Sequence, residues 1–177
     1  TLSEAEAAST VILHFGAVDY EAKLYINNTY VGIHKGGYTS FSFDISKYVA
    51  AGENTIFLTV TDMGRSKLQP TGKQCFIYES IGCEYTRTTG IWQTVWFEIV
   101  PEIYVKSVKI DTTCQSVRMK FNGGAEDKSI EIETPKGKEF YRFSGDIFET
   151  DIKSPRVWNT EDPYLYRYTL KCGDDTV

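Results

Sequence analysis

Short segments in which apolar and polar residues alternate recur along almost the whole chain, and this pattern restricts the possible folds more than any other feature. A period of two places every second side chain on the same face of a strand, whereas a helix repeats about every 3.6 residues. After the first ten residues no segment has the helical period over the length of an ordinary helix. Glycine, asparagine and proline separate the alternating segments. The sequence therefore predicts an all-β protein.

Six strands are predicted before residue 101, and the turns between them carry local signals. Asn27 and Asn28 form a tight turn, because asparagine tolerates the left-handed backbone that a hairpin needs. Asp44 is expected to cap one helical turn over residues 45–49. The six predicted strands are 11–15, 21–27, 29–34, 38–43, 55–61 and 90–100.

The segment from Asp62 to Thr89 is long, rich in glycine and without alternation. A loop of this length inside a compact domain usually has a function or is held by a partner. The strand that follows it begins at Gly90, where the absence of a side chain allows a sharp turn. Trp92 and Trp96 lie on one face of that strand and are predicted to be core residues.

Pro101 interrupts the pattern and suggests a boundary, after which a second β unit begins. Regular short strands separated by turn residues are typical of a β-sandwich. Trp158 precedes the last long strand and is predicted to lie in the sandwich core. The predicted strands of this half are 104–111, 116–121, 129–133, 141–143, 148–152 and 164–172.

Length, charge and cysteine content exclude several classes of protein. The 177 residues suffice for one or two domains. A net charge of −5, with basic residues scattered among acids, does not suit a nucleic-acid surface. No apolar run reaches the roughly 18 residues of a membrane helix.

The cysteines and histidines do not suggest a metal site. The four cysteines have irregular spacing and there are only two histidines, so no zinc site is predicted. Free thiols in a reducing compartment are expected, although pairing of Cys75 with Cys83 stays open. No catalytic serine or cysteine arrangement and no phosphate-binding glycine motif is found.

A series of motifs in a fixed order carries a resemblance to a known family. The motifs are His14-Phe-Gly-Ala-Val-Asp-Tyr20, Tyr25-Ile-Asn27, Val31-Gly32, His34-Lys-Gly-Gly-Tyr38, Phe41-Ser-Phe-Asp44, Gly52-Glu-Asn54, Gly72-Lys-Gln74, Thr89-Gly-Ile-Trp-Gln-Thr-Val-Trp96 and Trp158-Asn-Thr-Glu-Asp-Pro163-Tyr-Leu-Tyr166. Across residues 11–177 they resemble the sugar-binding and immunoglobulin-like domains of glycoside hydrolase family 2. That family includes β-galactosidases, β-glucuronidases and β-mannosidases.

The resemblance implies a jelly-roll (galactose-binding-like) sandwich over residues 1–102 and an immunoglobulin-like β-sandwich over residues 103–177. The first domain is expected to be truncated at its start and the second at its end. Family enzymes also contain a catalytic (β/α) barrel, which holds both carboxylates of the retaining hydrolysis. A barrel alone needs roughly 250 residues. The chain is therefore expected to be an inactive portion, without catalytic residues, metal or cofactor, of an enzyme of the β-galactosidase type that hydrolyses terminal β-glycosidic bonds.

The resemblance also names a substrate-binding residue on the long loop. In related β-galactosidases and β-glucuronidases, an aspartate six residues before the glycine of the Gly-Ile pair reaches the active site. Glu84 holds that position here, with one methylene more than aspartate. An exposed carboxylate there accepts hydrogen bonds from sugar hydroxyls. Arg87 is expected to support the loop by pairing with Glu84 or Glu79, unless it is simply solvated.

Other residues of the motifs are assigned structural roles. His34 and Tyr38 flank two glycines and are expected to shape that bend rather than to bind sugar. Asp19 and Asp44 resemble family positions that tie turns by hydrogen bonds from the backbone. The remaining pair, Lys73 and Gln74, is expected to dock on the barrel.

The sequence leaves three functions open, and they differ in the partner that the chain would bind. As part of a family 2 enzyme, it completes the substrate pocket for a β-galactoside-type carbohydrate and braces the barrel of the same polypeptide. The alternatives are a free-standing carbohydrate-binding module and a structural adhesion-type pair of sandwiches. Neither a nucleic acid nor a membrane is an expected partner. The chain is expected to form a homo-oligomer, and its expected location is the cytoplasm.

Overall fold

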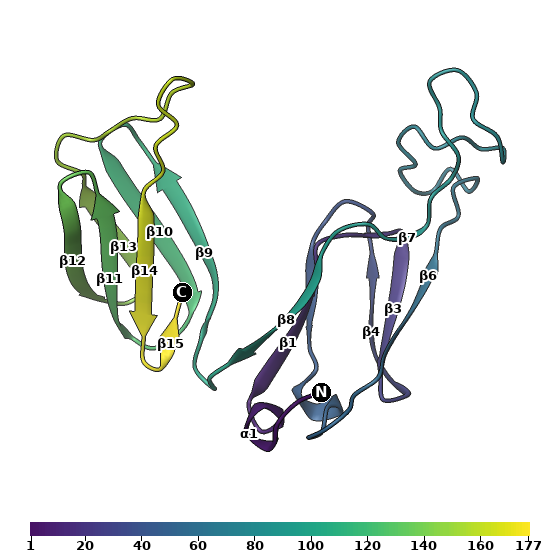
Figure 1. Ribbon diagram of the computed structural model, residues 1–177, viewed down its shortest axis with the longest axis horizontal. Coiled ribbons are helices and arrows are strands. Elements are labelled where there is room, and N and C mark those ends of the chain that lie inside the picture. The colour runs from purple at the N-terminus through teal and green to yellow at the C-terminus, as the bar shows by residue number, and fades with distance from the viewer. The chain divides into compact units, whose positions relative to one another are not determined.

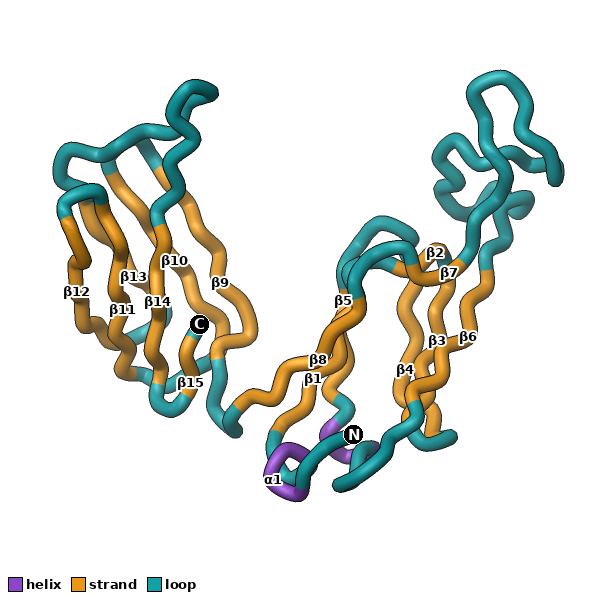
Figure 2. The backbone as a smooth tube through the Cα atoms, viewed as in Figure 1, coloured by secondary structure: helices purple, strands orange, loops and turns teal.

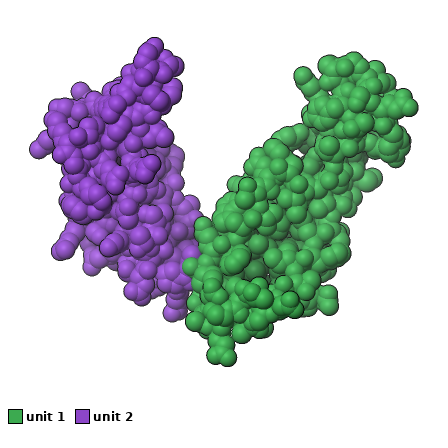
Figure 3. Space-filling model, viewed as in Figure 1, with its two compact units in different colours: residues 1–99 green, residues 100–177 purple.

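The computed structural model describes residues 1–177 and divides them into two compact units (Figure 3). Unit 1 comprises residues 1–99 and unit 2 residues 100–177. Strands form nearly all of the regular structure in both units (Figure 1), which confirms the predicted all-β class. The exceptions are the short helix α1 (Glu4–Ala7) and the 3₁₀ turn η1 (Ser46–Tyr48).

Unit 1 contains two three-stranded sheets and a small two-stranded one. The sheet orders are β5-β1-β8, β4-β3-β6 and β2-β7. The strands are β1 (Thr10–Phe15), β2 (Val18–Asp19), β3 (Glu21–Ile26), β4 (Thr29–Lys35), β5 (Phe41–Asp44), β6 (Ile56–Thr61), β7 (Gly90–Ile91) and β8 (Val95–Val100). Between β3 and β4, Asn27 and Asn28 have φ angles of 49° and 65°, as predicted for the tight turn. Asp44 Oδ1 accepts a hydrogen bond from the Ser46 backbone N–H at 3.0 Å, so it ties the turn before η1.

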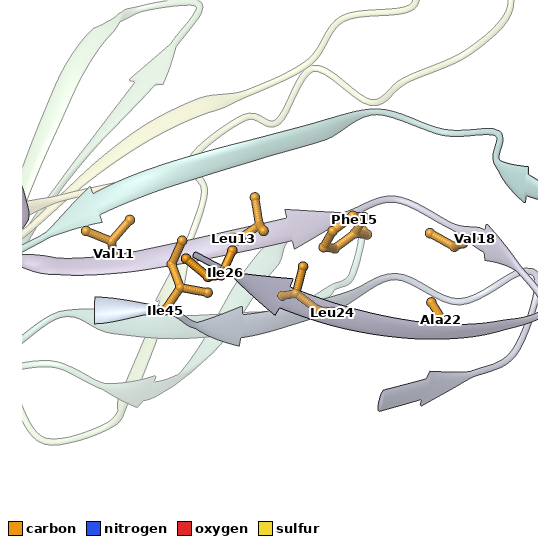
Figure 4. Packing of buried hydrophobic residues seen from close by; sticks show 8 residues of the cluster. All are labelled: Val11, Leu13, Phe15, Val18, Ala22, Leu24, Ile26 and Ile45. Carbon is orange, nitrogen blue, oxygen red and sulfur yellow. The ribbon is translucent and has the colours of Figure 1, made fainter. Parts of the chain in front are cut away.

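The core of unit 1 lies between β1 and β3; buried and partly exposed residues alternate along β3, whereas β1 has three consecutive buried residues. Buried apolar residues from these strands and their neighbours form one cluster (Figure 4). Its members are Val11, Leu13, Phe15, Val18, Ala22, Leu24, Ile26 and Ile45. This packing fixes the positions of β2 and β3, from which the site described below is built.

The strand predicted over residues 90–100 is present only in part, and the predicted burial of its two tryptophans is wrong. The strand is interrupted between β7 and β8, and Trp92 and Trp96 are 53% and 41% exposed rather than buried. β8 lies at the edge of its sheet, next to β1. Trp96 stacks on His14 with ring centroids 4.9 Å apart, and the Trp92 indole N–H donates to the Gly37 carbonyl at 2.7 Å. The two rings therefore make local contacts instead of forming a core.

Unit 2 contains two sheets whose paired strands are antiparallel. The sheet orders are β13-β10-β9 and β12-β11-β14-β15. The strands are β9 (Val105–Thr112), β10 (Ser116–Gly123), β11 (Asp127–Thr134), β12 (Gly137–Ser144), β13 (Ile147–Asp151), β14 (Arg167–Cys172) and β15 (Asp175–Thr176). The core cluster consists of Val117, Met119, Phe121, Ile130, Ile132, Phe148 and Leu170.

Trp158 is not a core residue, which corrects the prediction. Its side chain is 56% exposed and lines an apolar cavity of about 570 Å³ together with Tyr166 and Val117. The strand expected from Tyr164 begins only at Arg167, because residues 153–166 form a loop. An ion pair between Arg156 and Asp162 closes part of that loop.

The remaining sequence-based expectations concern cysteines, metals and membranes. All four cysteines are free thiols, with Cys75 and Cys172 buried. His, Cys, Asp and Glu side chains do not gather anywhere in a group of three or more suited to a metal ion. Neither helix has the length or the apolar character needed to cross a bilayer.

Candidate functional site

The candidate site is the segment of residues 62–89, which connects β6 to β7 (Figure 2). It contains no strand or helix, as the sequence predicts, and isolated bridges join Gln74 to Tyr85 and Ile81 to Glu84. Cys75 is fully buried, and its backbone N–H donates to the Tyr85 carbonyl at 2.7 Å. The segment is therefore an irregular loop, called the 62–89 loop below, that is pinned at specific points.

The main pin of the loop is the hydrogen-bonded series Asp19–Gln74–Thr88. The side-chain amide of Gln74 donates to Asp19 Oδ2 at 2.7 Å, and Gln74 Oε1 accepts from the Thr88 backbone N–H at 2.9 Å. Asp19 lies on β2, which pairs with β7 so that Asp19 faces Gly90. One glutamine thus ties the middle of the loop both to the sheet and to the loop's own end.

Asp19 is buried, with 8% of its surface exposed, and its second carboxylate oxygen has no hydrogen-bond partner. The backbone of Gly37 packs against this oxygen so closely that a Cβ at position 37 would lie 2.6 Å from it. Burial raises the pKa of the Asp19 carboxyl; the hydrogen bond from Gln74 lowers it and the negative charge of Asp62 adds to the rise. Asp19 therefore anchors the loop although burial disfavours the charged form of its carboxyl.

The raised pKa of Asp19 predicts a pH dependence that an asparagine would lack. The native state binds the proton more tightly than the unfolded chain, so the stabilisation is complete below the unfolded pKa and is lost as the pH rises through the folded pKa. The unfolding free energy of wild type, measured against that of Asp19→Asn, is expected to fall as the pH rises above 3.8. Urea unfolding at stepped pH measures the difference, with the exposed acid variant Glu53→Gln as control. Parallel pH curves for wild type and Asp19→Asn would contradict it.

Glu84 lies at an exposed tight turn of the loop. Its backbone N–H and carbonyl bond with those of Ile81 at 3.0 and 3.2 Å, and Gly82 takes a φ of 59° within the turn. The structure contains no ion pair or side-chain hydrogen bond of Glu84. The backbone turn thus places the Glu84 carboxylate at the surface, where it is free to accept hydrogen bonds.

Arg87 does not pair with Glu84 or Glu79, so that expectation is wrong. Its guanidinium lies instead over the Tyr78 ring, with Cζ 4.1 Å from the ring centroid. The hydrogen bond from Arg87, followed by the charges of Arg87 and Arg65, lowers the pKa of the Tyr78 hydroxyl. Arg87 still ties two parts of the loop together, but through an aromatic ring.

Two further residues were assigned roles that the structure refines. His34 bonds to the Gly36 carbonyl at 3.2 Å and stacks on Phe41, which fits a role in shaping the bend. Gln74 is engaged inside the unit by Asp19 and Thr88, so it has a role in holding the loop that the sequence did not predict.

Sequence reasoning missed Tyr78, Asp62 and the pairing of Asp19 with Gln74. Asp62 accepts a hydrogen bond from Gln69 Nε2 at 2.5 Å and helps to line a cavity of about 350 Å³ with Tyr78 and Arg87. Thr86 and Thr89 complete that lining. The sequence shows only that polar and aromatic residues are abundant in a loop without alternation. This composition does not indicate which of these side chains are in contact.

Solved structures share the fold of this chain. A β-glucuronidase from an uncultured Clostridium species aligns with 100% of this chain and 32% of its own, with a TM-score of 0.74 and 19% identity. The Bacteroides uniformis β-glucuronidase aligns with 98% of this chain and 23% of its own, with a TM-score of 0.68 and 24% identity. The fold is that of the jelly-roll and immunoglobulin-like β-sandwich domains found in glycosidases.

Family models and sequence relatives identify the family. Residues 2–101 match the sugar binding domain of glycosyl hydrolases family 2, and residues 98–177 match a second model of that family. The β-galactosidase of Thermoanaerobacter pseudethanolicus is 30% identical over 183 residues, and that of Thermoanaerobacterium thermosulfurigenes 25% over 197. The matches cover 91% and 97% of this chain but 23% and 26% of those enzymes. The chain belongs to glycosyl hydrolases family 2.

Proposed function

We propose that the chain supplies the sugar-binding and immunoglobulin-like portion of a glycosidase that hydrolyses terminal β-glycosidic bonds, of the β-galactosidase type. In this role, the 62–89 loop presents Glu84 to the substrate pocket of a catalytic barrel. The observation that carries the proposal is the contrast between the two ends of the loop. Its base is fixed by Asp19 and Gln74, whereas the Glu84 carboxylate is exposed and unpaired.

The relatives support the proposal, because the two named above are β-galactosidases whose length far exceeds the matched region. None of residues 1–177 forms a barrel of alternating strands and helices. The two carboxylates of retaining hydrolysis, about 5–5.5 Å apart, would therefore come from another part of the protein. In this mechanism Glu84 accepts hydrogen bonds from sugar hydroxyls and helps to orient the substrate, without transferring a proton itself.

Glu84→Gln is expected to reduce kcat/KM about tenfold in a protein that contains this chain together with its barrel. A charged acceptor binds hydroxyls more strongly than a neutral amide does, and the loss falls within the range for hydrogen bonds to charged groups. Hydrolysis of p-nitrophenyl β-galactoside measures the effect. Glu79→Gln is the matched control, because Glu79 is an exposed acid of the same loop. Equal kcat/KM for Glu84→Gln and wild type would overturn the role of Glu84.

The 177-residue chain on its own is expected to give no turnover of p-nitrophenyl glycosides, because its residues do not include the barrel carboxylates. The coding sequence after Val177 provides the complementary test. A barrel segment there supports the proposal, whereas a stop codon would favour a free-standing carbohydrate-binding module. Hydrolysis by the purified chain would contradict both readings.

A further inference from the structure

Two arginine side chains of the 62–89 loop lie against the ring of Tyr78. The guanidinium Cζ atoms of Arg87 and Arg65 are 4.1 and 5.4 Å from the ring centroid. Arg65 Nε also donates to the Phe76 carbonyl at 2.7 Å, which restricts that side chain. No ion pair in the structure includes either arginine. Two cations are thus held beside one exposed ring, and neither of them forms an ion pair with a carboxylate.

This positive charge is concentrated in a chain whose net charge is −5. The hydrogen bond from Arg87 and both guanidinium charges lower the pKa of the Tyr78 hydroxyl. Planar guanidinium groups bind oxyanions such as carboxylate and sulfate through paired hydrogen bonds. The arrangement is therefore suited to a ligand with an oxyanion.

The cavity beside Arg87 adds a second requirement on the ligand. Besides Arg87 and Tyr78, its lining contains the hydroxyls of Thr86 and Thr89 and the carboxylate of Asp62. These groups are partners for the hydroxyls of a sugar. A simple anion would leave Asp62 facing a like charge, and a neutral sugar would leave the arginines uncompensated. A ligand that carries both hydroxyls and an oxyanion satisfies all of them.

We propose that Arg65, Tyr78 and Arg87, called the arginine–tyrosine site below, bind the oxyanion of an acidic saccharide while Asp62 and the two threonines receive its hydroxyls. The oxyanion is a carboxylate or a sulfate ester, since both present oxygens to a guanidinium in the same way. The inference rests on the proposed function in that it makes the 62–89 loop a carbohydrate-binding element, and it goes beyond that function by giving the loop an acidic ligand in addition to the neutral galactoside. It assigns Arg87 a contact with ligand beyond its support of the loop.

The test is a titration of the 177-residue chain with D-glucuronate, D-glucose 6-sulfate and D-glucose, followed by NMR of the arginine Nε–H signals. Both acidic sugars, or one of them, are expected to shift the Arg87 and Arg65 signals and to bind about tenfold more tightly than glucose. Comparison of the two acidic sugars shows whether carboxylate or sulfate is the better ligand. Arg87→Gln is expected to weaken the binding about tenfold. Arg65→Gln, at a more exposed position, is expected to weaken it as well, and the dispersion of the backbone spectrum shows that each variant is folded.

Lys73→Gln is the matched control, because it removes one positive charge from the same loop at a residue without a contact to Tyr78. Its affinity for the acidic sugars is expected to equal that of wild type. The proposal is overturned if glucose binds as tightly as both acidic sugars, or if Lys73→Gln loses as much affinity as Arg87→Gln. Binding of acetate as tight as that of glucuronate would overturn the saccharide requirement.

The outcome is separable from that of the proposed function. Loss of acidic-sugar binding concerns Arg65 and Arg87 in the chain alone, whereas the proposed function depends on the effect of Glu84→Gln on a neutral galactoside. If Glu84→Gln lowers kcat/KM but no acidic sugar shifts the arginine signals, only the arginine–tyrosine site is refuted.

Discussion

Lys128→Ala is expected to lower the free energy of unfolding of unit 2 by about 2–4 kcal/mol. The Lys128 side chain is buried, and its Nζ donates to the carbonyls of Ala125 and Gly145 at 2.6 and 2.9 Å. The same ammonium lies 3.7 Å from Asp146 Oδ1. Alanine would leave both carbonyls without their donor and would remove the packing of the lysine stem.

Amide hydrogen exchange measures the change where it is expected, at the core strands β11 and β14. The protection of Ile130 and Leu170, both fully buried, should fall with the stability of unit 2. Lys120→Ala is the matched control, since Lys120 is an exposed strand residue of the same unit without an ion pair. It should alter stability by no more than about 0.5 kcal/mol. Equal losses of unfolding free energy in the two variants would mean that the buried ammonium of Lys128 contributes no more to stability than an exposed one.

Alternation predicts strands well where both faces of the pattern have a fixed environment. In β10, Val117, Met119 and Phe121 are buried and the residues between them are more exposed, as the period of two requires. The hairpin at Asn27 and Asn28 was equally accessible, because the demand for a positive φ is local. These features depend only on residues close together in the sequence.

Burial of the tryptophans could not be predicted in this way. The period of two predicts that Trp92 and Trp96 share a face, but it does not predict the break in the strand between Ile91 and Val95 or whether that face is covered. β8 is an edge strand, and Val95 and Phe97 on its opposite face are 39% and 52% exposed as well. Aromatic content therefore indicated a strand correctly and a core incorrectly.

The same difference between local and long-range information applies to the candidate site. Counting back from Gly90 selects Glu84 as the candidate, because a motif fixes its distance along the chain. The anchor of its loop joins Asp19 to Gln74, which are 55 residues apart, and no local pattern links a buried aspartate to a particular glutamine. The contact of Arg87 with Tyr78 was missed because electrostatic reasoning favours an acid as the partner, whereas the loop geometry supplies a ring.

Gly37→Ala tests whether the close packing on Asp19 sets the position of the 62–89 loop. The added Cβ would lie 2.6 Å from Asp19 Oδ1 and 3.1 Å from its Cγ, so the buried carboxyl must move. We expect a loss of about 1–3 kcal/mol in the unfolding free energy of unit 1, as for overpacking at other well-packed sites. Displacement of Asp19 should also weaken the hydrogen bond from Gln74 and, through it, the bond to the Thr88 N–H. Faster hydrogen exchange at Thr88 is the specific readout.

Gly64→Ala provides the comparison, since its Cβ would meet no atom closer than 3.6 Å and neither glycine has a positive φ. That variant is expected to keep the protection of Thr88 and to raise stability by about 0.5 kcal/mol, because alanine has less freedom to lose on folding. A Gly37→Ala variant that loses stability but keeps Thr88 protected would show that the loop is held without Asp19. Faster exchange at Thr88 in Gly37→Ala alone would instead mean that the hydrogen bond from Thr88 to Gln74 depends on the close packing of Gly37 against Asp19.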